Sequence, residues 1–161
     1  MEESKLVTDT ERVDICSMVN DIKNQVALTS EKQNIKINNL LPQNCITTGN
    51  RSLLYSIFRN LTDNAINYAG EGSTITIKCN SSDKDFYYFT FYDNGVGVPE
   101  EHLEKLFERF YRIDKGRSRQ LGGTGLGLAI VKNAVIAHGG TITAYNQTGG
   151  GLAFNFTIKK I

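Results

Sequence analysis

The stretch that decides the fold of this 161-residue chain reads NLTDNAINY and covers residues 60–68. Apolar residues recur at helical spacing through and before it, which predicts a helix from Asn50, its N-cap, to about Ala69. Asp14 is expected to cap an earlier helix in the same way. At about 100° per residue, Asn60, Asn64 and Asn67 share a stripe about 60° wide beside the apolar face of this helix. Asparagine is a mediocre helix former, but its neutral carbonyl oxygen suits Mg²⁺ whose other ligands are phosphates and water. Considered alone, the stripe is more typical of a solvated helix face.

A second motif, DNGVGVP, covers residues 93–99 at the end of a predicted strand. The glycines Gly95 and Gly97 would let the backbone approach a flat ligand closely. The Asp93 carboxylate can accept a hydrogen bond from the exocyclic amine of adenine, whereas guanine carries a carbonyl oxygen there. The motif therefore favours adenine over guanine.

A third motif, GGTGLGLAIV, covers residues 122–131 and leads into a helix predicted from about Thr124 to His138. Glycines at the start of a helix free backbone N–H groups to face phosphate oxygens, and the helix dipole favours the same arrangement. The glycine spacing fits neither a Rossmann fingerprint nor a P-loop. A nucleotide site here is therefore of another type.

Together with FERFYR at residues 107–112, these motifs resemble, in order and spacing, the N, G1, F and G2 boxes of sensor histidine kinases. The resemblance covers roughly residues 11–160. It implies the Bergerat ATP-binding fold that histidine kinases share with DNA gyrase, mismatch-repair ATPases and heat-shock chaperones. That fold is an α+β two-layer sandwich, in which three helices cover one face of a mixed sheet.

The resemblance also implies roles for individual residues. Asn64 would be the Mg²⁺ ligand and Asn60 would contact the ligand or its waters, with Arg112 reaching the phosphates as the third catalytic residue. Asp93 would read adenine. The other residues implied in ATP binding are Asn67, Tyr68, Gly95, Gly97, Arg109, Gly123, Thr124, Gly125, Leu126 and Gly127. Residues 98–122 would form a mobile lid anchored by Phe107 and Phe110.

Two positions depart from the family pattern. Asn67 stands where relatives often carry Lys or Arg, so one cationic phosphate contact is missing or comes from a basic residue of the lid. Leu152 stands where many relatives carry Thr or Ser that holds adenine through water. Both departures leave open a non-catalytic nucleotide-binding module as an alternative.

Asn60 also bears on the reaction. The hydrolysing relatives place a Glu base there, and an amide cannot take a proton at neutral pH. The resemblance therefore implies transfer of the ATP γ-phosphoryl group to a histidine on a separate dimerisation domain, for relay to a response regulator. A serine kinase or ATPase of the same superfamily is the other alternative. His102 is expected to be solvated and His138 to complement a helix end, so neither is an acceptor.

The remaining expectations concern the charge balance, the domain bounds and the length of the apolar runs. Lys plus Arg is 18 and Asp plus Glu is 17, so no global field favours nucleic acid or an anionic membrane. Residues 1–13 are interpreted as a linker from a missing dimerisation domain or as a short strand, and residues 14–161 as the catalytic domain. No apolar run is long enough to span a bilayer. The resemblance implies that this fragment is the cytoplasmic part of a membrane-anchored sensor.

Overall fold

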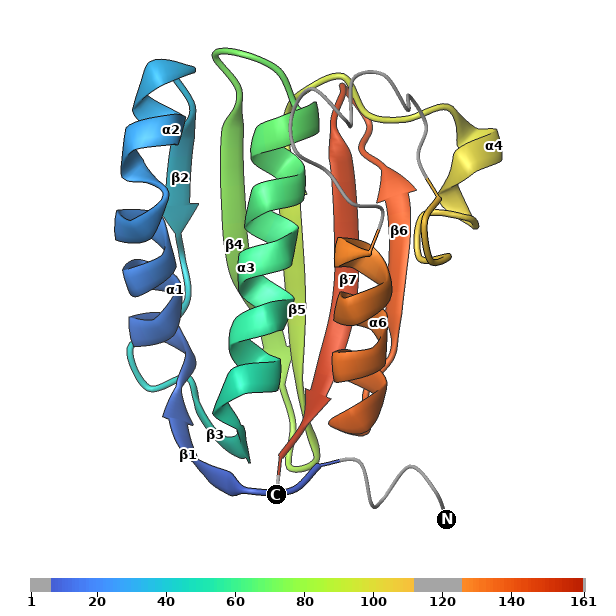
Figure 1. Cartoon of the computed structure of the whole chain (residues 1–161). Helices are drawn as coiled ribbons and strands as arrows, with labels where there is room; N and C mark the ends of the chain where they lie inside the picture. The colour runs from blue at the N-terminus through green and yellow to red at the C-terminus, as the bar shows by residue number, and fades with distance from the viewer. Residues whose placement is uncertain (1–6, 112–125, 161) are drawn as a thin grey trace.

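The computed structural model describes residues 7–111 and 126–160, which form two layers (Figure 1). One layer is a five-stranded sheet of β2 (Lys36–Asn39), β4 (Thr74–Ser82), β5 (Phe86–Asp93), β7 (Leu152–Lys159) and β6 (Ile142–Asn146), in that order. Only β2 and β4 run parallel, so the sheet is mixed. The expected α+β architecture is confirmed. Within the described residues, no helix has the length and apolar character needed to cross a membrane.

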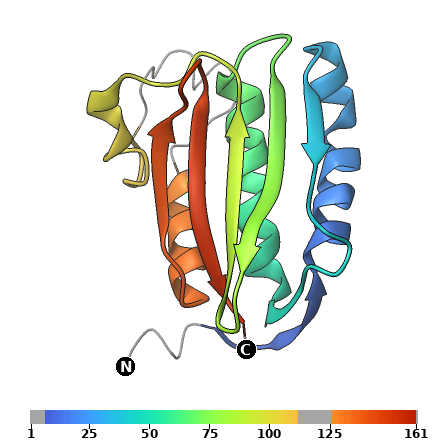
Figure 2. The ribbon, with the colours of Figure 1, turned by 180° about the vertical axis from the view of Figure 1, so that it is seen from behind.

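Three helices cover one face of this sheet, and the other face is open (Figure 2). They are α1 (Ile15–Gln25), α3 (Arg51–Tyr68) and α6 (Gly127–Ala137), with α3 in the middle. Asp14 caps α1 by accepting from the Ser17 N–H at 3.0 Å, and Asn50 caps α3 by accepting from the Leu53 N–H at 3.0 Å. Both N-caps agree with the sequence prediction.

Residues 10–14 form a strand, β1 (Thr10–Asp14), that pairs antiparallel with β3 (Ile46–Asn50) below the main sheet. The segment considered either a linker or a strand is therefore a strand from residue 10 onward. Two short helices complete the described chain: α2 (Ala27–Lys32) directly follows α1, and α4 (Glu100–Leu103) follows β5.

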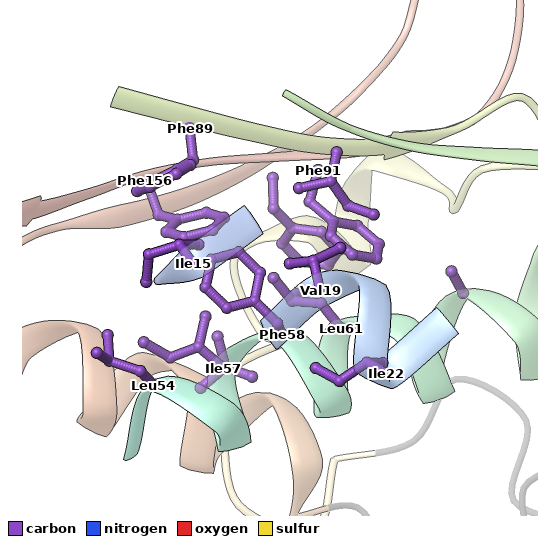
Figure 3. Packing of buried hydrophobic residues seen from close by; sticks show 14 of the residues in the cluster. Ile15, Val19, Ile22, Leu54, Ile57, Phe58, Leu61, Phe89, Phe91 and Phe156 are labelled. Carbon is purple, nitrogen blue, oxygen red and sulfur yellow. The ribbon is translucent and has the colours of Figure 1, made fainter. Parts of the chain in front are cut away.

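Aromatic side chains join the two layers (Figure 3). Phe58 of α3 lies edge-on to Phe89 of β5 and Phe156 of β7, with ring centroids 5.8 and 5.7 Å apart. All three rings are buried, and burying an aromatic side chain removes a large apolar area from water. Because this cluster fixes the buried face of α3, it also fixes the direction in which the asparagine stripe points.

Candidate functional site

The asparagine stripe lies half-buried along α3, on the side toward α6. The Asn60 side-chain amide donates to the Ser56 carbonyl oxygen at 2.8 Å. Its other atom, Oδ1, faces Gly127 at the start of α6, where a Cβ would lie only 3.2 Å away. The structure thus brings two predicted site residues, 67 positions apart in the chain, into direct contact.

Asp93 ends β5 and is buried. Its Oδ1 accepts from the Gly95 N–H at 2.8 Å and from the Leu152 N–H at 3.3 Å. Burial raises the pKa of this carboxyl group, and the two N–H donors oppose that shift. Leu152 therefore lies beside Asp93, as its position in the motif suggested, but it contributes its backbone N–H, and its side chain is buried in the core.

The glycines of the DNGVGVP loop are required by the protein itself. A Cβ on Gly95 would lie 2.0 Å from the carbonyl oxygen of Ala69, the C-cap of α3. Gly97 has a φ of +69°, and its Cβ would lie 2.7 Å from Asn146 Oδ1. The sequence interpretation ascribed both glycines to a flat ligand, whereas these contacts within the protein already account for them. A base above them stays a prediction.

The two contacts of α3 define the ends of the candidate site. At the C-terminal end of the helix Ala69 meets Gly95, and about 14 Å back along the axis Asn60 meets Gly127. Figure 1 shows this arrangement, with the loop after β5 above the start of α6. Asn64 and Asn67 project from the helix between these ends, and Tyr68 is its last residue. The site is therefore elongated, with a carboxylate at one end and a helix start at the other.

The remaining predicted site residues either lie outside the described residues or are placed less closely with respect to the site. Arg112, Gly123, Thr124 and Gly125 lie outside the described residues. Leu126 is the N-cap of α6 and is half-buried. Arg109 is exposed, with its guanidinium 5.6 Å from the centroid of the Phe110 ring.

The expected anchors of the lid behave differently from each other. Phe107 packs against the core, 6.0 Å from the ring of Phe154. Phe110 is 62% exposed and has a φ of +66°, so its predicted anchoring role is wrong in this structure. Leu106 is buried in the core, and residues 112–122 of the expected lid lie outside the described residues. A turn after α4 directs residue 106 inward and leaves residue 110 in solvent.

Of the two histidines, His102 differs from expectation, whereas His138 complements a helix end as expected. His102 is half-buried rather than solvated, and its ring contacts the Tyr111 hydroxyl. His138 is buried at the end of α6, where Nδ1 donates to the Ala134 carbonyl oxygen at 2.9 Å and Nε2 accepts from the Asn50 N–H at 3.1 Å. That pattern needs the neutral ring, and burial lowers the pKa of His138. Hydrogen bonding rather than charge therefore holds this residue.

Three residues that sequence reasoning missed hold the DNGVGVP loop. Asn146 bonds twice to the backbone of Val98, and the Gln147 side chain donates to the Asp93 carbonyl oxygen at 3.1 Å. A Cβ on Gly151 would lie 1.9 Å from that same carbonyl oxygen. The glycine run at 149–151 was a signal for close backbone packing. An asparagine at the end of a strand carried no such signal.

A magnesium ion fits this chemistry only together with phosphates. No group of three or more His, Cys, Asp or Glu side chains in the described parts of the chain could hold a metal ion. The asparagine stripe of α3 instead offers neutral amides, and a neutral oxygen is a weak ligand by itself. Asn64, with Asn60 one turn away, could complete the coordination of an ion that arrives with a nucleotide.

Comparison with known proteins shows the family of the chain. Residues 49–161 match the family described as histidine kinase-, DNA gyrase B- and HSP90-like ATPase. The chain belongs to this family of ATP-binding domains. Over nearly its whole length it is, more particularly, similar to sensor histidine kinases, as the four motifs implied.

Two relatives and one solved structure illustrate the likeness. Sensor histidine kinase WalK of Bacillus subtilis is 36% identical over 149 residues, 92% of this chain. Sensor-like histidine kinase SenX3 of Mycolicibacterium smegmatis is 33% identical over 160 residues, 99% of this chain. The catalytic domain of histidine kinase ThkA shares the fold, with a TM-score of 0.82 at 24% identity over 95% of this chain and 97% of that one. The chain spans only 24% of WalK and 41% of SenX3.

Proposed function

We propose that this chain is the catalytic, ATP-binding part of a sensor histidine kinase, and that it transfers the γ-phosphoryl group of ATP to a histidine on a separate dimerisation domain. One observation carries the proposal. The amide stripe of α3 is bounded at one end by the buried Asp93 loop and at the other by Gly127 at the start of α6. A nucleoside triphosphate has the matching sequence of groups, from a base with an amine to a chain of phosphates.

Each end of the site suits one end of ATP. At the loop, the Asp93 carboxylate is the acceptor for the adenine amine, and Gly95 and Leu152 hold its Oδ1 in place from the backbone. At the other end, the N–H groups of the first turn of α6 face the phosphates, because the first N–H groups of a helix have no partner within it. We propose that Arg112 and the glycines 123 and 125 complete this end.

Asn64 and Asn60 would hold Mg²⁺ from the side of α3. When bound, the ion neutralises phosphate charge, and phosphoryl transfer depends mainly on such neutralisation and on positioning. The protein contributes a fixed amide at position 60, since its Nδ2 is already committed to Ser56. That commitment orients Oδ1 toward the gap between α3 and α6 before any ligand binds.

The same amide explains why water is a poor acceptor in this proposal. A general base must accept a proton, and the Asn60 amide does not do so at neutral pH. A neutral imidazole is itself nucleophilic and needs less activation than water. Neither histidine in this chain is available for the role, because both ring nitrogens of His138 are hydrogen-bonded inside the core and His102 contacts Tyr111. The acceptor is therefore on another domain.

We propose a response regulator as the next partner in the relay. Histidine kinase ThkA, whose fold this chain shares, has been solved in complex with the response regulator protein TrrA. We further propose that residues 1–9 connect to the histidine-bearing dimerisation domain, and that the full protein is membrane-anchored with this part in the cytoplasm.

The test mixes the chain, γ-labelled ATP and Mg²⁺ with the histidine-bearing hairpin of its parent protein. We expect acid-labile label on the hairpin, lost in the Asn64→Ala variant and retained in Asn155→Ala, which lies on the open face of the sheet. Nucleotide binding without transfer would instead indicate a non-catalytic module. Rapid release of phosphate without the hairpin would indicate an ATPase.

A further inference from the structure

We infer that Asn146 is a positioning residue for nucleotide binding, which fixes the loop that carries Asp93 where this loop meets α4. The inference rests on the proposed function of the site. Asn146 is the last residue of β6, the edge strand of the sheet, which lies next to α4. Neither its place in the sequence nor the family motifs assigned it a role.

The inference rests on a pair of hydrogen bonds between the side chain of Asn146 and the backbone of Val98. Asn146 Oδ1 accepts from the Val98 N–H at 2.9 Å, and Asn146 Nδ2 donates to the Val98 carbonyl oxygen at 2.6 Å. An amide presents one donor and one acceptor side by side, so it can pair with a residue's N–H and C=O as a neighbouring strand would. Asn146 thereby ties an irregular loop to a strand of the main sheet.

The position of Val98 in the chain explains why these two hydrogen bonds matter for the Asp93 loop. Val98 stands five residues after Asp93 and one residue before Pro99, the N-cap of α4. The other end of the loop is held by different groups, since Gln147 and Leu152 both bond to Asp93. The loop is therefore fastened at its start by the β6–β7 turn and at its end by Asn146.

The backbone of Gly97 passes close to the same Asn146 side chain. Its φ of +69° favours glycine, and a Cβ there would lie 2.7 Å from Asn146 Oδ1. The loop thus passes over the amide at close range in a conformation that other residues rarely adopt. Loss of the amide would free Val98 and remove the contact that defines the path of Gly97.

A purely structural asparagine would affect only folding stability, whereas a positioning residue also affects the ligand. If Asn146 sets the path of the loop between Asp93 and Val98, its loss should weaken the binding of adenine nucleotides and reduce the preference for ATP over GTP. Asn155 provides a matched control. It lies on the adjacent strand β7, where its exposed side chain alternates with the buried Phe154 and Phe156, and it accepts from the Thr90 hydroxyl at 2.7 Å.

The experiment compares Asn146→Ala, Asn146→Ser and Asn155→Ala in the whole chain. Titration with ATP and Mg²⁺, with ADP and with GTP gives the affinities, and amide exchange of Val98 reports the local contact. We expect Asn146→Ala to lower the affinity for ATP and ADP about tenfold and to bring the affinities for ATP and GTP closer together. Amide exchange at Val98 should become faster. Asn146→Ser, which keeps one hydroxyl, should fall between Ala and the parent, and Asn155→Ala should stay within about twofold of the parent.

Two outcomes would overturn the inference. One is an Asn146→Ala protein that is folded and binds ATP within about twofold of the parent chain. The other is Asn155→Ala weakening ATP as much as Asn146→Ala does. If Asn146→Ala does not fold, the comparison of Asn146→Ser with Asn155→Ala decides in the same way. Failure of the parent chain to bind ATP would contradict the proposed function instead, and the exchange rate of Val98 would still report whether Asn146 holds the loop.

Discussion

Asn60 Oδ1 and Gly127 face each other between α3 and α6, with 3.2 Å separating that oxygen from the place where a Cβ on residue 127 would be. The Asn60 amide cannot easily turn away, because its nitrogen is hydrogen-bonded to Ser56. The absence of a side chain at residue 127 therefore leaves room for the oxygen that we assign to the ligand.

Replacing Gly127 by alanine should separate folding from nucleotide binding. Alanine is favoured over glycine in a helix by up to about 1 kcal/mol, which offsets the tight contact, so we expect the free energy of unfolding to change by less than about 1 kcal/mol. The affinity for ATP with Mg²⁺ should nevertheless fall, because the new methyl group displaces Asn60 Oδ1. Isothermal titration and chemical denaturation measure the two quantities.

A double-mutant cycle with Asn60→Ala provides the control for Gly127→Ala. If the effect acts through the amide, Gly127→Ala should cost little further affinity once Asn60 is already alanine. Equal losses in both backgrounds would show that the methyl group acts on something other than Asn60.

Asp93→Asn should change the choice between bases. Asparagine keeps an oxygen that can accept from Gly95 and Leu152, but it presents an NH₂ group where the carboxylate has its second oxygen. We expect ATP to lose about 1–3 kcal/mol of binding free energy, the range for a hydrogen bond to a charged group, and GTP to lose less. Competition between ATP and GTP measures this, and an unchanged preference would remove Asp93 from the base site.

The same variant makes a prediction about stability. Because burial raises the pKa of Asp93 above the unfolded value, the folded state binds the proton more tightly, so this group costs stability as pH rises through that range. Asp93→Asn should therefore unfold no more easily than the parent at pH 7. A large loss of stability at pH 7 would show that the charge itself holds the loop.

His138 should make the domain sensitive to mild acid. Burial lowers its pKa, so its contribution to stability is fully present above the unfolded pKa of about 6.5 and is lost as pH falls through the folded value. The free energy of unfolding should fall toward low pH with a slope of at most about 1.4 kcal/mol per unit from this group. His138→Gln should flatten this pH dependence, and an unchanged pH dependence in that variant would refute the assignment.

Gly95→Ala should destabilise the fold whether or not a ligand is present. Its Cβ would lie 2.0 Å from the Ala69 carbonyl oxygen, and a backbone atom cannot move aside as a flexible side chain can. We expect a loss of about 1–3 kcal/mol or more, as for overpacked sites. Denaturant titration without nucleotide measures it. A stable Gly95→Ala protein that fails only to bind ATP would favour the original interpretation, in which the glycine serves the base.

The elements that could be predicted from the sequence are those with a strong local signal. The apolar spacing along residues 53–68 and the caps at Asp14 and Asn50 indicated the helices, and the glycine motifs at 93–99 and 122–131 indicated the ends of the site. The family follows from the order of these motifs, because four spaced motifs rarely arise together by chance.

The features that could not be predicted depend on contacts between distant segments. The sequence shows that residue 95 is glycine, but only the fold shows that Ala69 lies against it. The pairing of Asn146 with Val98 joins residues 48 positions apart, and neither residue type is unusual at a strand end or in a loop. Likewise, Phe110 has the character of an anchor, and its exposure follows from the turn after α4.

The most direct test of the central claim is calorimetric titration of the chain with ATP, with and without Mg²⁺, for the parent protein and for Asn64→Ala. If the asparagine stripe of α3 is the wall of an ATP site, the parent should bind ATP more tightly with Mg²⁺ than without it. Asn64→Ala should lose most of that gain while keeping the affinity measured without the ion. The absence of ATP binding by the parent, or an Asn64→Ala protein with the full Mg²⁺ effect, would contradict the account.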